Sequence, residues 1–168
     1  MRNAGRGGER KPDGSLVSAA DHAASAIIGA RLHALDPALP VICEEAVQDT
    51  AGAPRFWLVD PLDGTREFLR GSNVFSVNIA LIENGYPCFG AIHLPASGLG
   101  YWGASGAGAW RDGGGIRARR LAEAGAGLHV LVSPGEHDSA QREFAATLAR
   151  HGGTPRIEAA AGAIKFCW

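Results

Sequence analysis

Trp57-Leu58-Val59-Asp60-Pro61-Leu62-Asp63-Gly64-Thr65-Arg66-Glu67-Phe68 is the stretch that decides how this chain of 168 residues folds. The apolar run from Phe56 to Val59 predicts a buried strand that ends on Asp60. Pro61 is expected to stop the ladder pairing there and to stiffen the turn that follows.

The turn carries two kinds of binding group. Asp60 and Asp63 are carboxylates on a rigid segment, and such oxygens suit a hard cation such as Mg²⁺. Gly64 and Thr65 follow with backbone N–H groups that suit an anion. A metal and an anion on one turn indicate phosphate-ester chemistry.

An isolated Asp-Pro-x-Asp-Gly string is an ordinary turn, but the longer string resembles the signature of a known family. With the strand before it and Thr-Arg-Glu-Phe after it, it resembles the inositol monophosphatase superfamily of Mg²⁺-dependent, Li⁺-sensitive phosphatases. The ending Thr65 to Phe68 is most similar to the 3'(2'),5'-bisphosphate nucleotidase branch, the CysQ type. Three further segments match in the expected order: Lys11 to Asp21, Val41 to Glu45, and Ala161 to Cys167.

The resemblance implies a set of site residues. The metal ligands for two or three Mg²⁺ ions would be Glu44, Asp60, Asp63 and the Leu62 carbonyl. Gly64 and Thr65 would hold the phosphoryl oxygens, and the Thr65 hydroxyl would orient the attacking water with Asp21 as proton acceptor. Substrate contacts are expected from Lys11, His137 and Lys165, whereas Glu45 is expected to be a supporting or surface acid.

Some of these residues also have simpler interpretations. Asp21 lies three residues after Ser18 and can cap a helix, because a carboxylate there satisfies N-terminal N–H groups. Lys11 can equally be an exposed side chain.

The implied activity is a Mg²⁺-dependent phosphomonoesterase acting on 3'-phosphoadenosine 5'-phosphate or its sulfated relative, linked to sulfur metabolism. Inositol-1-phosphate is the alternative substrate. Arg66-Glu67-Phe68 favours the nucleotidase, because Thr-Asn-Phe is commoner at this place in inositol phosphatases. The chain is expected to be truncated at both ends, since an N-terminal helix and a downstream Trp-Asp-x-Ala motif are missing. A third hypothesis is therefore a catalytically impaired relative that binds metal or anion, weakly active and forming homo-oligomers.

The composition argues against two classes of partner, nucleic acids and membranes. The formal net charge of −1 argues against a nucleic-acid-binding surface, and no apolar stretch approaches membrane-spanning length. Three widely spaced cysteines without a Cys-x-x-Cys motif fit reduced thiols in a cytoplasmic protein.

The pattern of elements predicts a mixed α/β (α+β) fold, an incomplete version of the layered αβαβα sugar-phosphatase fold. Residues 1–14 are expected to be flexible, residues 15–115 to form a metal-binding α+β unit, and residues 125–168 to start a second α/β unit. A helix is expected from Ser18 to about His33. Strands are expected at residues 41–43, 56–59, 75–81, 89–94, 100–103, 107–111, 128–132 and 156–158, with a second helix at 141–150 and a loop after Phe68. Asn84-Gly85 predicts a hairpin turn within an antiparallel sheet, whereas the more continuously apolar run at 128–132 is typical of a parallel sheet.

Overall fold

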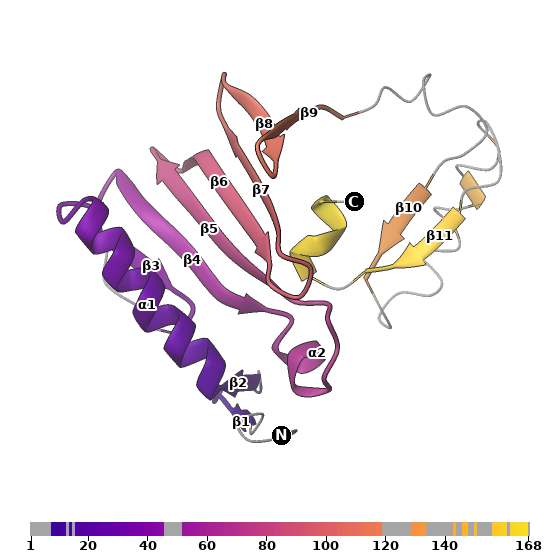
Figure 1. Ribbon diagram of the computed structural model, residues 1–168, viewed down its shortest axis with the longest axis horizontal. Helices are drawn as coiled ribbons and strands as arrows, with labels where there is room; N and C mark the ends of the chain where they lie inside the picture. The colour runs from indigo at the N-terminus through magenta and orange to yellow at the C-terminus, as the bar shows by residue number, and fades with distance from the viewer. Residues whose placement is uncertain are drawn as a thin grey trace. The chain divides into compact units, whose positions relative to one another are not determined.

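The computed structural model describes residues 8–12, 14, 16–45, 52–118, 129–133, 143, 146–147, 150, 156–160 and 162–167. The chain divides into two compact units, Met1–Ile116 and Arg117–Trp168. The fold is mixed α+β, as the sequence predicts (Figure 1).

A seven-stranded sheet in the order β3-β4-β5-β6-β7-β8-β9 forms the first unit. β3 runs parallel to β4, and the strands that follow form an antiparallel meander in which each pairs with the next in sequence. The predicted antiparallel sheet with a turn at Asn84-Gly85 is therefore confirmed. The bounds are β3 Val41–Cys43, β4 Arg55–Asp63, β5 Ser76–Glu83, β6 Tyr86–Leu94, β7 Leu99–Ala104, β8 Gly108–Arg111 and β9 Gly114–Ile116.

Helix α1, Ala19–Leu35, packs on β3 and β4 (Figure 1). It begins, as predicted, with a capping box. The Ser18 side chain accepts a hydrogen bond from the Asp21 backbone N–H, and the Asp21 side chain accepts one from the Ser18 backbone N–H. Leu32 of α1 packs with Trp57, Val59 and their neighbours in the buried core. No helix within the described ranges is long and apolar enough to cross a membrane.

Strand β4 continues past Pro61, which corrects the prediction that pairing stops there. Asp60 pairs with Asn78, the register then shifts, and Asp63 pairs with Ser76. The irregularity leaves Pro61 between two paired positions, so its missing N–H removes no ladder bond. The two acids thus lie on one bulged strand and not on a free turn.

The sequence did not predict several short elements, four of which, β1, β2, β9 and α2, belong to the first unit. Strand β1, Gly8–Arg10, pairs antiparallel with β2, Leu16–Ser18, so the expectation of a flexible segment up to residue 14 is wrong for Gly8–Arg10. β9 extends the meander by one strand. Helix α2, Thr65–Leu69, begins after Gly64, its N-cap residue, and ends one residue beyond Phe68, where a loop was expected to start.

In the second unit, β10, His129–Val132, pairs parallel with β11, Arg156–Ala159, as the continuously apolar pattern predicts. Glu143, Ala146, Thr147 and Arg150 are helical, in line with the helix expected at 141–150. A 3-10 helix, η2, covers Gly162–Phe166.

Gly64, the residue before α2, allows a sharp test of the local backbone. Its φ is +92°, and a Cβ would lie 3.0 Å from the Val74 carbonyl oxygen. We expect Gly64→Ala to lower the free energy of unfolding by more than about 1–2 kcal/mol, the cost of the left-handed conformation alone. Gly98→Ala is the matched control, because Gly98 has φ +73° with nothing within 4 Å of its Cβ position.

Urea unfolding of the two variants checks this expectation. Equal destabilisation by both substitutions would show that the contact with Val74 contributes nothing.

Candidate functional site

Asp21 and Thr65, 44 residues apart, meet in a hydrogen bond. Thr65 Oγ1 donates to Asp21 Oδ1 over 3.1 Å, and the Leu62 carbonyl oxygen lies 3.2 Å from the same hydroxyl. Asp21 is 1% exposed, and its other oxygen accepts bonds from the Ser18 N–H and hydroxyl. The carboxylate therefore caps α1, as one interpretation of the sequence predicts, and it also holds the first residue of α2. Its role as proton acceptor stays a prediction.

Asp60 lies among like charges. Burial raises its pKa to about 6, and the charges of Asp63, Glu44 and Asp21 act in the same direction. The Leu62 N–H, which donates to Asp60 Oδ1 over 3.1 Å, opposes the shift. These four acids come from α1, the end of β3 and the bulged end of β4, so the fold gathers carboxylates that are scattered in the sequence.

Lys11 lies between the two glutamates that follow β3. Its Nζ is 3.1 Å from Glu44 Oε1 and 2.8 Å from Glu45 Oε1. Desolvation lowers its pKa, but the hydrogen bonds and charges of Glu45 and Glu44 outweigh it, so the pKa is raised and the ammonium stays charged. The structure thus shows Lys11 neutralising acids, where the sequence suggested contact with phosphate or solvent.

The two glutamates differ in burial, and the difference favours the supporting over the surface role of the two expected for Glu45. The Glu45 side chain is 4% exposed and the Glu44 side chain is 52% exposed. Glu45 is therefore the buried acid of the pair, not a surface residue.

Two polar residues of β5 were missed by the sequence reasoning. Ser76 is fully buried, and its hydroxyl lies 3.4 Å from Asp63 Oδ2. Asn78 pairs with Asp60 in the sheet, and its Oδ1 is buried without a hydrogen-bond partner. The signal available in the sequence was that Ser76 and Asn78 are the polar positions of an alternating strand. Only the pairing of β5 with β4 shows that these positions lie opposite the acids.

A hollow of about 280 Å³ adjoins the start of α2. Gly14, Leu16, Gly64, Thr65, Arg66 and Glu67 line it. The predicted anion-binding residues Gly64 and Thr65 therefore border an open space large enough for a phosphoryl group.

The donor atoms suit Mg²⁺ in kind, since all are carboxylate or carbonyl oxygens. The raised pKa of Asp60 reflects negative charge that a cation would compensate. Across the described ranges, however, no group of three or more His, Cys, Asp or Glu side chains could hold a metal ion in its present arrangement. Glu44 is turned to Lys11, so metal binding by these residues stays a prediction.

The remaining predicted substrate contacts, His137 and Lys165, belong to the part of the chain after the first unit. His137 lies outside the described residues. Lys165 belongs to the second unit, where its Nζ lies 2.6 Å from Ser133 Oγ.

Comparison with known proteins gives a consistent family. The model of the inositol monophosphatase family matches residues 2–168. A 3'(2'),5'-bisphosphate nucleotidase CysQ of Salmonella typhimurium is 37% identical over 161 residues, covering 94% of this chain and 63% of that protein. A histidinol-phosphatase of Mycobacterium tuberculosis is 38% identical over 113 residues, covering 67% of this chain and 44% of that protein.

A solved structure supports the same fold. The crystal structure of CysQ from Bacteroides thetaiotaomicron, described as a bacterial member of this family, superposes with a TM-score of 0.71 at 30% identity. The superposition covers 88% of this chain and 60% of that chain. The chain spans less than two thirds of the length of the relatives it matches.

The pKa of Asp60 predicts a pH dependence of stability without metal. The folded-state pKa of about 6 is above the usual 3.8, so the folded chain binds this proton more tightly than the unfolded chain. The resulting stabilisation is complete below pH 3.8 and is lost as the pH rises through about 6.

Asp60→Asn removes this titration and the repulsion. In the presence of a chelator we expect the variant to melt higher than the parent at pH 7.5, with the difference shrinking towards pH 4. Thermal unfolding monitored by circular dichroism gives the comparison, with Asp112→Asn, an exposed aspartate on the β8–β9 turn, as control. A difference that is independent of pH would contradict the assigned shift.

Proposed function

The chain belongs to the inositol monophosphatase family, and we propose that it serves Mg²⁺-dependent hydrolysis of a phosphomonoester. The proposed substrate is a nucleoside bisphosphate such as 3'-phosphoadenosine 5'-phosphate. Supporting the substrate class are the similarity to bisphosphate nucleotidases over 94% of the chain and the Thr65 to Phe68 ending.

The observation that carries the proposal is the hydrogen bond from Thr65 to Asp21. When the hydroxyl donates to Asp21, its lone pairs are free to accept a hydrogen bond from a water molecule. Thr65 Oγ1 can then take a proton from that water and pass its own proton to Asp21 Oδ1. Because Asp21 is 1% exposed, this proton path is shielded from bulk solvent.

Phosphate binding would fall to the start of α2. The first N–H groups of a helix have no intrahelical partner, so those of Gly64 and Thr65 can donate to phosphoryl oxygens in the adjoining hollow. Glu44, Asp60, Asp63 and the Leu62 carbonyl would hold Mg²⁺. Bound there, Mg²⁺ supplies charge that polarises the phosphoryl group and lowers the pKa of the attacking water.

Phosphate release from the full chain at millimolar Mg²⁺ tests the proposal. We expect 3'-phosphoadenosine 5'-phosphate to be hydrolysed faster than inositol-1-phosphate or histidinol phosphate. Thr65→Val should lower the rate by roughly a hundredfold or more, the usual range for a lost acid–base step. Ser97→Ala, which removes a hydroxyl bonded only to the Leu94 carbonyl in its own turn, is the control.

The outcomes separate the alternatives. A preference for inositol-1-phosphate or histidinol phosphate would overturn the substrate class while leaving the phosphatase. Mg²⁺ binding without turnover would favour the non-catalytic relative.

Replacing Asp63 with Asn tests the metal site independently of turnover. The change keeps the size of the side chain but removes one ligand charge, so we expect Mg²⁺ affinity to fall by roughly tenfold or more, about 1.4 kcal/mol. Isothermal titration calorimetry with Mg²⁺ measures this, and Asp112→Asn again makes the same chemical change away from the acids. An unchanged affinity would remove Asp63 from the ligand set.

A further inference from the structure

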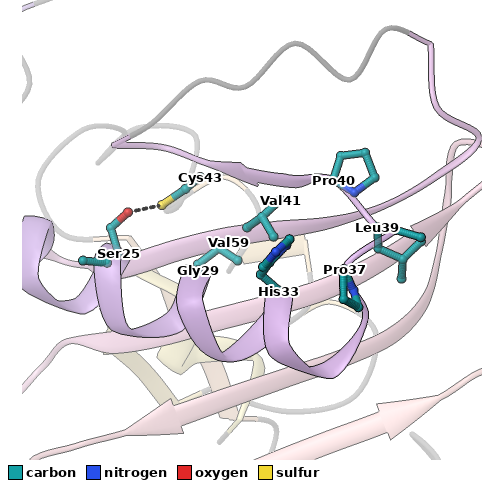
Figure 2. A pocket seen from close by; sticks show the side chains of 11 residues that line it. Ser25, Gly29, His33, Pro37, Leu39, Pro40, Val41, Cys43 and Val59 are labelled. Atoms are coloured by element: carbon teal, nitrogen blue, oxygen red, sulfur yellow. Dashed lines mark hydrogen bonds between the residues drawn. The ribbon is translucent and has the colours of Figure 1, made fainter.

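A second cavity is lined by none of the residues proposed for the chemistry. It measures about 560 Å³ and opens between α1 from Ser25 to His33, the turn of residues 37–40, and strands β3 and β4 (Figure 2). This volume falls within the roughly 300–1,000 Å³ typical of pockets for small organic ligands.

The walls of the cavity are mostly apolar, and Pro37, Leu39, Pro40, Val41 and Val59 contribute apolar surface. Ser25 Oγ and Cys43 Sγ, joined by the dashed line in Figure 2, lie 3.0 Å apart at one end. The His33 ring lies away from this pair, near Pro37.

The lining of the cavity is also poor in charged side chains. Among the described residues that line the cavity there is no Asp, Glu, Lys or Arg, and His33 is the titratable group besides Cys43. A charged ligand would lose part of its hydration there without gaining an ion pair from such a residue.

Gly29 provides an independent sign that this space is open. It lies inside α1, where glycine is a poorer helix former than alanine. A Cβ at this position would meet nothing within 4 Å, so no packing constraint requires the glycine. The helix therefore forgoes stability at a residue whose side chain would project into the cavity.

We propose that this cavity is a binding site for a small, uncharged, largely apolar molecule whose one hydrogen-bonding group pairs with Ser25 and Cys43, and that its occupation alters the acid cluster. The site is separate from the proposed catalytic residues, although the effect on the acids rests on the proposed function.

Ser25 and Cys43 are each close in sequence to one of the acids, Ser25 on α1 and Cys43 at the end of β3. Ser25 follows Asp21 by one helical turn of α1. Cys43 is the last residue of β3 and immediately precedes Glu44. The Glu44 N–H donates a hydrogen bond to the Val59 carbonyl of β4. A group that separates Ser25 from Cys43 therefore pushes directly on the segments that carry Asp21 and Glu44.

N-ethylmaleimide, which is small and uncharged, is the probe. The Cys43 sulfur bonds to one alkene carbon, the carbon–carbon π bond breaks, and the thiol proton ends on the other carbon. Peptide mass spectrometry of the native full chain follows Cys43 separately from Cys88 and Cys167.

Although Cys43 is 5% exposed, we expect it to react within about tenfold of the rates of the two less buried thiols. Benzyl alcohol at millimolar concentration should slow the reaction of Cys43 several-fold, and benzoate should not. Gly29→Leu, which fills the cavity, should slow it at least tenfold, whereas Ala30→Leu on the exposed side of α1 should leave it unchanged.

Three results would overturn the binding site. One is a Cys43 rate no faster than global unfolding, measured by its dependence on low urea. The others are equal protection by benzoate, or equal effects of the Gly29 and Ala30 variants.

Isothermal titration calorimetry with Mg²⁺ on the alkylated chain measures the coupling between the cavity and the acid cluster. We expect alkylation to lower the Mg²⁺ affinity at least threefold. Unchanged affinity after complete Cys43 modification would refute the coupling. Absence of Mg²⁺ binding in the unmodified chain would instead refute the metal site of the proposed function, and the alkylation results would still decide the cavity.

Discussion

The first unit depends on one buried carboxylate. Asp21 accepts hydrogen bonds from the backbone and side chain of Ser18 and from the hydroxyl of Thr65, so it joins β2, the start of α1 and the start of α2. A carboxylate that is 1% exposed is costly to bury unless it is hydrogen-bonded, and these donors meet that requirement. The same bonds hold the Thr65 hydroxyl 3.2 Å from the Leu62 carbonyl of β4, so the group that starts the helix also organises the proposed chemistry.

Strand β4 supplies the second constraint, because it ends in an irregularity instead of a free turn. The register shift after Asp60 brings Asp63 opposite Ser76 and leaves Pro61 where no ladder bond is needed. Both acids are thus held by strand pairing on a segment whose backbone has little freedom. Burial and mutual repulsion at this point raise the pKa of Asp60, and the same conditions make a compensating cation favourable.

Much of this arrangement follows from local patterns in the sequence. The capping residues Ser18 and Asp21, the Asn84-Gly85 turn and the meander strands up to β8 were predictable, because helix caps and hairpins depend on neighbouring residues. The contacts of Lys11 with Glu44 and Glu45, and the burial of Glu45, depend on how distant segments meet. The extension of β4 past Pro61 likewise depends on where its partner strand places its bonds. Such features arise from register and tertiary packing, which no local pattern encodes.

The bridge from Lys11 to Glu44 has a consequence for how the acids respond to their surroundings. Its ammonium is a cation tethered to the same chain, so its effective concentration near Glu44 does not change when the solution is diluted, and short tethers give values of about millimolar. Any divalent ion that uses Glu44 has to compete with this fixed occupant. The raised pKa of Lys11 keeps the competitor charged across neutral pH. In the proposed metal site, Glu44 would therefore stay paired with Lys11 until the concentration of free divalent ions is high enough to displace the ammonium.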